Sequence, residues 1–216
     1  MMMRRLFRPF KKEFDQEVSM QETTAPFIIV GLGNPGREYR DTRHNIGFLA
    51  IDRLCAVLGV SMNRVQSRAI IGTGSIAGRK VILAKPQTFM NLSGQAVSGL
   101  LRFYKTPLDQ LLVAHDELDL PFGTIRLRPG GGSAGQGGMK SIIQHLGGQN
   151  FARLRLGIGR PPGQMESKAY VLRRFQASEQ ELLNILLDSA ADAARTFVAE
   201  GIDAAMNRFN GSLIEK

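Results

Sequence analysis

The sequence predicts a single-domain α/β/α sandwich with a mixed, mostly parallel central sheet. Short β-branched runs alternate with amphipathic helical stretches from Phe27 onward. The first of these runs ends in a glycine-rich turn, which is how α/β proteins bring polar groups to the carboxyl edge of the sheet. The 216 residues also suit one domain with a sizeable core. We therefore expect one catalytic domain at 26–216, preceded by an extension at 1–25.

Composition indicates a protein that meets an anionic partner. The chain holds 28 Lys and Arg against 19 Asp and Glu, a net charge of +9, which favours nucleic acid or an acidic surface. Its one cysteine, Cys55, excludes an intrachain disulfide and suits the core of a helix in a reducing, cytoplasmic setting. No apolar run approaches the ~20 residues that a membrane span needs. We expect a soluble, cytoplasmic monomer.

The extension at 1–25 begins with arginines and lysines, and acidic residues follow soon after. Transit peptides are poor in acids, so this pattern favours a flexible, solvated extension. An additional contact to RNA or to a membrane surface is the alternative.

The first half of the domain is expected to hold a strand, a helix, a hairpin and a second helix. The first helix places apolar residues on one face from Ile46, with Thr42 or Asn45 as its N-cap and Gly59 as its stop. The hairpin turns at Ala77-Gly78-Arg79. The strands are expected at 27–31, 69–76 and 80–85, and the second helix opens near Asn91 or Ser93 and has Val97, Leu100, Leu101 and Tyr104 as its buried stripe.

The second half alternates strands and helices again. A buried strand at Leu111–Ala114 runs into His115-Asp116-Glu117-Leu118-Asp119, and Thr124–Arg128 alternates apolar and polar residues. A glycine-rich loop at 130–138 precedes a helix. A strand at 153–158 follows, and Ser178 with Glu181 forms the capping box of a last helix with an apolar face from Leu182 to Phe197.

Gly31-x-Gly33-x-x-Gly36 has the spacing of a dinucleotide-binding fingerprint, but its context differs. The fingerprint needs its third glycine inside a helix packed on the sheet, and no apolar stripe appears here before Ile46. No second strand ends in an acid ~20 residues downstream either. We expect no cofactor, and a nucleotide-dependent enzyme is the weakest of the alternatives.

His44 and Asp116 are the expected catalytic pair. Imidazole titrates near neutral pH, and a carboxylate on one ring nitrogen leaves the other free to take a proton from water. His115 is a competing base, although its place at a strand end favours a structural hydrogen bond. A capping role is the alternative for His44. No serine or cysteine lies in a nucleophile elbow, and three scattered histidines show no metal-ligand spacing.

Amides and basic residues surround this pair in the sequence. Asn34 and Asn91 lie in loops at element ends, where they either shape turns or hold a peptide-like group. Basic residues gather around the glycine-rich loop and its neighbouring strands, as a solvated face or as a phosphate clamp. These residues are Arg126, Arg128, Lys140, Arg153 and Arg155.

Four spaced segments together resemble the bacterial-type peptidyl-tRNA hydrolases. They are Gly31–Gly36 with Thr42-Arg43-His44-Asn45, then Thr88–Gly94, then His115–Pro121, and the glycine-rich loop followed by Arg153–Gly159. The resemblance runs from about Phe27 to the C-terminus. It implies a monomeric α/β/α enzyme without a cofactor that cleaves the ester joining a peptide to the terminal ribose of tRNA.

The resemblance also implies roles for single residues. His44 would be the general base, with Asp116 as its orienting partner. Arg128 and Arg155 match the family's contacts to the tRNA 5′ phosphate, and Arg126 and Lys140 extend that basic set. The expected substrate-binding residues are Asn34, Tyr39, Met90, Asn91, Gln136 and Gly137.

The glycine-rich loop departs from the family pattern. The family usually has a His-Asn pair where this chain has Gln136 and Gly137, and that asparagine contacts substrate. One lost substrate hydrogen bond would cost ~1–3 kcal/mol, or roughly one to two decades in rate. Because some plant organellar relatives are splicing factors, a non-catalytic RNA-binding protein on the same fold is the main alternative.

Overall fold

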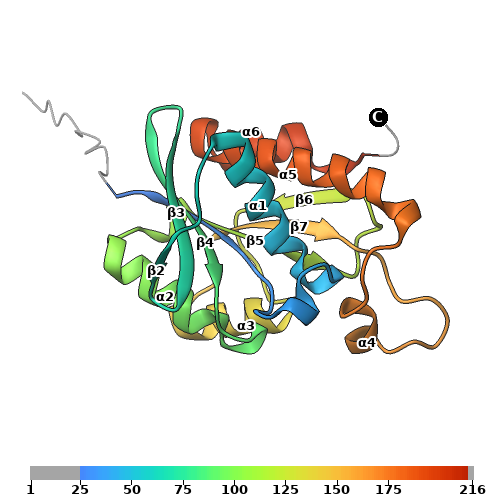
Figure 1. Ribbon diagram of the computed structural model, residues 1–216. Coiled ribbons are helices and arrows are strands. Elements are labelled where there is room, and N and C mark those ends of the chain that lie inside the picture. The colour runs from blue at the N-terminus through green and yellow to red at the C-terminus, as the bar shows by residue number, and fades with distance from the viewer. Residues whose placement is uncertain (1–24, 214–216) are drawn as a thin grey trace, which may run out of the picture.

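The computed structural model describes residues 25–213 (Figure 1). Residues 1–24 of the expected extension therefore lie outside the described residues. One sheet of eight strands forms the centre of the described chain, in the order β2-β3-β4-β1-β5-β7-β6-β8. β1 pairs in parallel with β4 and β5, β5 pairs in parallel with β7, and the other pairs are antiparallel. The strands are β1 (Phe27–Gly31), β2 (Arg64–Gln66), β3 (Ala69–Ile76), β4 (Arg79–Pro86), β5 (Leu111–Glu117), β6 (Thr124–Arg128), β7 (Ala152–Gly157) and β8 (Gly211–Ser212).

Helices cover both faces of the sheet, which confirms the predicted α/β/α sandwich (Figure 1). On one face, α1 (Ile46–Leu58), α5 (Gln180–Glu200) and α6 (Ile202–Phe209) bury the larger core. On the other face, α2 (Ser93–Tyr104) and α3 (Gly137–Leu146) bury a second core against β4, β1 and β5. A short helix, α4 (Ser167–Val171), lies beyond the carboxyl end of the sheet (Figure 1).

β6 and β7 carry arginines on one face of the sheet. Their register pairs Arg126 with Arg155 and Arg128 with Arg153. The alternate residues of both strands are apolar and belong to the core beneath α5, so the arginines project to the opposite side. We call these four residues the arginine face.

Several predicted boundaries are confirmed. β3 and β4 form the expected hairpin, and β6 spans Thr124–Arg128 as predicted. Gly59 ends α1 in the left-handed conformation at φ 64°. β5 is longer than expected, because it continues through Glu117 and so places Asp116 within the sheet.

Asn45 occupies the predicted N-cap position of α1, but the predicted cap of α2 is wrong, because Leu92 holds that position. Neither Thr42 nor Asn45 caps a helix with its side chain, and the Ser93 hydroxyl donates to the Met90 carbonyl instead. Both helices continue from short 3₁₀ turns, η2 (Arg43–Asn45) and η3 (Met90–Leu92), which supply the preceding carbonyls. The side chains are therefore free for other partners.

The last long helix also begins differently. The structure places the capping box on Gln176 and Glu179, around the 3₁₀ turn η5 (Ala177–Glu179) that precedes α5, and not on Ser178 and Glu181. The Glu179 carboxylate accepts from the Gln176 backbone N–H at 2.7 Å. The chain thus turns helical two residues earlier than predicted.

Candidate active site

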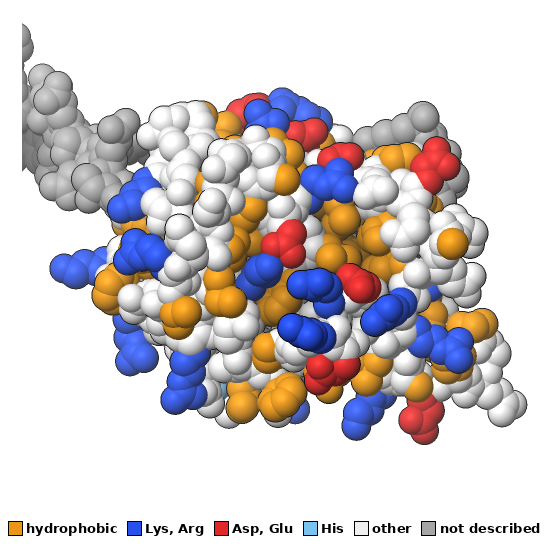
Figure 2. Space-filling view, viewed as in Figure 1, with side chains coloured by type: hydrophobic (Ala, Val, Ile, Leu, Met, Phe, Trp, Pro, Cys, Tyr) orange, Lys and Arg blue, Asp and Glu red, His pale blue; other side chains and the backbone are white. Residues whose placement is uncertain are grey.

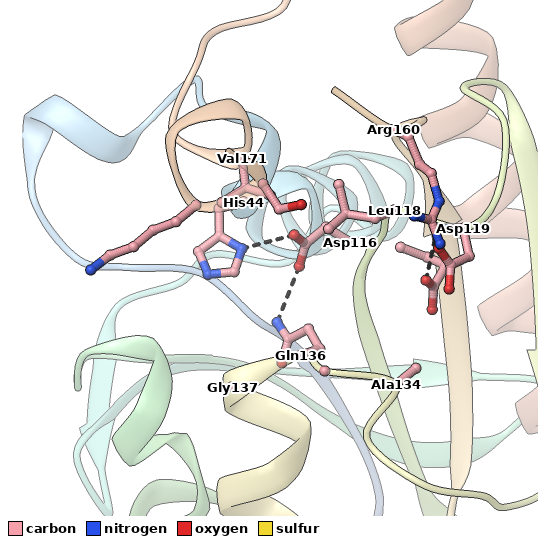
Figure 3. A pocket seen from close by; sticks show the side chains of 13 residues that line it. His44, Asp116, Leu118, Asp119, Ala134, Gln136, Gly137, Arg160 and Val171 are labelled. Atoms are coloured by element: carbon pink, nitrogen blue, oxygen red, sulfur yellow. Dashed lines mark hydrogen bonds and ion pairs between the residues drawn. The ribbon is translucent and has the colours of Figure 1, made fainter. Parts of the chain in front are cut away.

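His44 and Asp116 meet although 72 positions separate them. His44 lies on η2, directly before α1, and Asp116 lies near the carboxyl end of β5. The Nδ1 atom of His44 is 2.8 Å from Oδ2 of Asp116, and Figure 3 shows the second ring nitrogen directed away from that carboxylate. A carboxylate on Asp116 would accept from a protonated Nδ1, and Nε2 would then be the nitrogen that is free to act as a base.

This pair opens on a pocket of about 510 Å³. The pocket lies between the end of β5, the glycine-rich loop and α4, and Leu118 and Val171 give it apolar surface (Figure 3). Asp116 is 5% exposed, whereas the His44 side chain retains 16% exposure toward the pocket. A buried carboxylate behind a partly open imidazole suits proton transfer to and from a bound molecule.

Gln136 also contacts Asp116. Its Nε2 donates to Oδ1 of Asp116 at 3.1 Å and lies 3.1 Å from Sδ of Met90, while its Oε1 accepts from the backbone N–H of Met139 at 2.7 Å. Both ends of this amide are therefore engaged inside the protein. Gly137 lines the pocket beside it, and a Cβ added there meets nothing within 4 Å.

Asn45 is a structural residue that the sequence interpretation missed, because it was considered only as a cap. Its side-chain amide accepts from the Asn34 backbone N–H and donates to the Asn34 carbonyl, both at 2.9 Å. The Asn34 side-chain oxygen in turn accepts from the Met90 backbone N–H at 2.8 Å. These hydrogen bonds connect the glycine-rich turn to η3, and they leave the Asn34 NH₂ group without a partner among residues 25–213. The presence of Asn45 in the motif of His44 was the available signal.

Four predicted substrate-binding residues, Asn34, Tyr39, Met90 and Asn91, do not line the pocket. Tyr39 is half-buried on η1 (Arg37–Tyr39), and Asn91 is exposed on η3. Met90 is buried between Asn34 and Gln136. Among the predicted substrate-binding residues, Gln136 and Gly137 line the pocket that His44 opens on.

The residues directly before His44 are hydrogen-bonded to the segment that follows α4. The Arg43 backbone N–H donates to the Arg173 carbonyl at 2.9 Å, and Thr42 forms an isolated bridge with Arg174. The Arg43 guanidinium is 4% exposed, pairs with Glu179 at 2.7 Å and lies over the rings of Tyr170 and Phe175. This arrangement fixes the backbone on which His44 stands.

The predicted basic residues divide into paired and unpaired groups. Arg155 contacts Glu117 through Nε and Nη2, at 2.9 and 2.7 Å. Arg153 is 3% exposed and donates to the carbonyls of Gly131, Gly132 and Gln149; burial and the neighbouring Arg155 lower its pKa to about 10. Arg153 therefore holds the glycine-rich loop, and its predicted place in a phosphate clamp does not fit this burial.

A second pocket, of about 480 Å³, lies between the arginine face and the glycine-rich loop. Arg128 and Arg155 line it, and Arg128 makes no ion pair within the described residues. Arg126 and Lys140 are exposed but do not line it. Basic side chains also gather where the start of α1 approaches α4 (Figure 2).

The two competing nucleophilic or basic groups are inactive by their surroundings. His115 is buried and its Nδ1 lies 2.7 Å from the Asp116 carbonyl, as expected for a structural histidine; burial lowers its pKa. Burial also raises the pKa of the Cys55 thiol to about 11, so it stays protonated at neutral pH. Residues 25–213 contain no cluster of His, Cys, Asp and Glu that could hold a metal ion.

The family model for peptidyl-tRNA hydrolase matches residues 28–216. The chain belongs to the peptidyl-tRNA hydrolase family. A peptidyl-tRNA hydrolase of Exiguobacterium sp. is 50% identical over 84% of this chain and 98% of its own length. The chloroplastic peptidyl-tRNA hydrolase of Arabidopsis thaliana is 51% identical over 82% of this chain, which spans 62% of that relative.

Two further comparisons bear on the site. A chloroplastic group IIB intron splicing facilitator of Arabidopsis thaliana is 46% identical over 88% of this chain and 79% of its own length. The crystal structure of peptidyl-tRNA hydrolase from Acinetobacter baumannii has a TM-score of 0.81 at 40% identity, and covers 87% of this chain and 95% of that one. The fold and the family resemblance predicted from the motifs are thereby confirmed.

The glycines that resembled a nucleotide fingerprint have a different use in this peptidyl-tRNA hydrolase fold. Gly36, at φ 118°, precedes a 3₁₀ turn and not a packed helix. A Cβ on Gly31 would lie 2.1 Å from the Gly47 carbonyl oxygen of α1. Glycine is needed there because α1 crosses β1 at close range, which brings η2 and His44 to the sheet edge.

Proposed function

We propose that this protein hydrolyses the ester bond of peptidyl-tRNA with water activated by His44. The hydrogen-bonded His44–Asp116 pair beside a pocket, in a chain of the peptidyl-tRNA hydrolase family, carries this proposal. Nε2 of His44 takes a proton from water as the oxygen adds to the ester carbonyl. When the bond between the carbonyl carbon and the ribose oxygen breaks, the imidazolium gives its proton to that departing oxygen, which becomes the hydroxyl group of free tRNA. Free tRNA and a free peptide are the products.

Two other parts of the site support binding. The NH₂ group of Asn34 has no partner among residues 25–213 and is proposed as a neutral donor for a peptide carbonyl or for the developing oxyanion. Arg128 and Arg155 line the second pocket, which suits the phosphate of a tRNA end, with Arg126 and Lys140 as outer contacts. The roles of Tyr39, Met90 and Asn91 at the substrate remain predictions, Met90 as a buried support for Asn34.

Release of tRNA from a purified peptidyl-tRNA tests this function directly. The wild-type protein is expected to turn over peptidyl-tRNA repeatedly and to leave the ester of a free aminoacyl-tRNA largely intact. Binding of tRNA without any release would support the second candidate, a non-catalytic RNA-binding protein. The similarity to a splicing facilitator favours that candidate, while the intact His44–Asp116 pair favours the enzyme.

The proposal includes a cytoplasmic monomer that works without cofactor or metal. Within the described residues, no helix has the length and apolar character needed to cross a bilayer. Hydrolysis by activated water needs no redox or group-transfer cofactor. Sedimentation of the purified protein at assay concentrations tests the oligomeric part.

Arg128→Gln is expected to weaken substrate binding without altering chemistry. Arg128 is exposed and unpaired in the described chain, so its charge is available to phosphate, and the KM for peptidyl-tRNA should rise about 10-fold at unchanged kcat. The dependence of KM on salt should also become shallower. Lys80→Gln removes an exposed charge near the turn of the β3–β4 hairpin, separated from β6 by β1, β5 and β7, and should leave KM unchanged. Equal effects of the two variants would refute a local phosphate contact.

Gly137→Asn is expected to increase activity. A side chain at this position enters open space on the pocket wall, and asparagine is the residue expected there from the family. One new substrate hydrogen bond should raise kcat/KM by about 10-fold with an unchanged melting temperature. Gly137→Ala fills the same space without a polar group and is the control. An equal gain from alanine would show that the amide is irrelevant.

A further inference from the structure

We infer that Gln136 is a positioning residue that fixes both the ionised state of Asp116 and the tautomer of His44. The inference deepens the proposed function, but its spectroscopic test needs no substrate. Figure 3 shows the three side chains in a row, with Asp116 between His44 and Gln136. Each contact sets the direction of the next hydrogen bond.

The orientation of the Gln136 amide is determined by α3. The backbone N–H of Met139 can only donate, and it lies 2.7 Å from Oε1 of Gln136, so this end of the amide must be the oxygen. Gln136 occupies the N-cap position of α3, where such a bond satisfies an otherwise free N–H group. The NH₂ end is thereby directed at Asp116. At 9% exposure, Gln136 has little contact with water that could replace these bonds.

Asp116 therefore receives a donor on each carboxylate oxygen. Gln136 donates to Oδ1 at 3.1 Å and His44 donates to Oδ2 at 2.8 Å. The NH₂ group of Gln136 keeps Oδ1 free of a proton and favours the carboxylate, which accepts on both oxygens. The carboxylate in turn requires the proton of His44 on Nδ1, which leaves Nε2 as the base.

This hydrogen-bond chain makes an unusual prediction for an amide at position 116. In Asp116→Asn, the donor of Gln136 still needs an acceptor, so the new amide must turn its oxygen toward Gln136. Its NH₂ group then faces His44 and forces the proton onto Nε2, the nitrogen that should accept from water. The expected result is a kcat at least about 100-fold below wild type.

Adding Gln136→Glu to that variant should reverse the donor-to-acceptor direction of the hydrogen bonds that link positions 136, 116 and 44. The carboxylate introduced at position 136 accepts from the Met139 N–H with one oxygen. Its other oxygen accepts from the NH₂ group of the amide introduced at position 116. The oxygen of that amide then accepts from Nδ1 of His44, which restores the productive tautomer. We expect the double variant D116N/Q136E to recover at least about 10-fold in kcat over D116N.

Nitrogen-15 spectra of the His44 ring in the full-length protein provide the readout that is independent of activity. They should report the proton on Nδ1 in wild type, on Nε2 in D116N, and again on Nδ1 in the double variant. D116N/Q144E restores the same charge on the exposed face of α3 and should recover neither kcat nor the tautomer.

The inference is overturned if D116N and D116N/Q136E show the same His44 tautomer, or if D116N/Q144E recovers as much as D116N/Q136E. Melting temperatures of all variants separate these results from unfolding, since a folded protein gives an interpretable ring spectrum in every case. A wild-type protein without hydrolytic activity would refute the proposed function and leave the tautomer test intact.

Discussion

His44→Ala is expected to lower kcat for peptidyl-tRNA at least about 100-fold while the affinity for tRNA stays the same. The imidazole is the group in the pocket that combines a free ring nitrogen with an orienting carboxylate, so its loss leaves water without a base. The basic residues proposed for tRNA lie on the arginine face and α3, and the substitution does not touch them. Single-turnover release of tRNA and filter binding measure the two quantities separately.

His145→Ala is the matched control, because it removes an exposed imidazole from α3 whose Nδ1 lies 2.9 Å from the Ser141 carbonyl. It should retain wild-type turnover. A His44→Ala variant as active as this control would eliminate His44 as the general base and with it the proposed mechanism. A parallel loss of tRNA affinity would point to a collapsed site.

Glu179→Ala is expected to reduce the free energy of unfolding by about 3–5 kcal/mol, because it leaves a buried cation without its counter-ion. Arg43 is 4% exposed, and within residues 25–213 two of its guanidinium nitrogens, Nε and Nη1, have no hydrogen-bond partner. In the described part of the chain, Glu179 supplies the one ion pair of Arg43, at 2.7 Å. Urea unfolding followed by circular dichroism measures the loss.

Two variants test this explanation. Arg43→Met removes the cation and keeps much of its apolar contact with Tyr170 and Phe175, so it should destabilise less than Glu179→Ala. Glu181→Ala removes an exposed carboxylate from the same helix and should change stability by under about 0.5 kcal/mol. If Arg43→Met lowers the free energy of unfolding more than Glu179→Ala does, the loss comes from the missing ion pair and not from a buried cation without a counter-ion.

Hydrophobic periodicity was sufficient to predict the fold, but local rules failed where a tertiary partner competes for the same side chain. The hairpin of β3 and β4 and the end of α1 at Gly59 depend on neighbouring residues alone, and both predictions hold. The side chains expected to form cap hydrogen bonds have other partners instead. Asn45 bonds to the turn after β1, and Glu179 serves Arg43 as well as the helix start.

The candidate site divides in the same way. The motifs of His44 and Asp116 predicted a pair, and the adjacency of β1 and β5 brings it together. The burial of Arg153 against loop carbonyls gives no local signal, since an arginine in an alternating strand reads as exposed. The contact of Gln136 with Asp116 depends on where α3 begins relative to β5, which only the folded chain determines.

The attachment of the turn at Thr42 and Arg43 to residues 173–174 restricts how the pocket can adapt to cargo. An outward movement of α4 and residues 173–174 is expected to displace the backbone of His44 as well. Space for a larger substrate is expected instead at the pocket wall formed by the glycine-rich loop, where Gly135 and Gly137 leave unfilled space. We therefore expect large peptide side chains to be accommodated beside these two glycines.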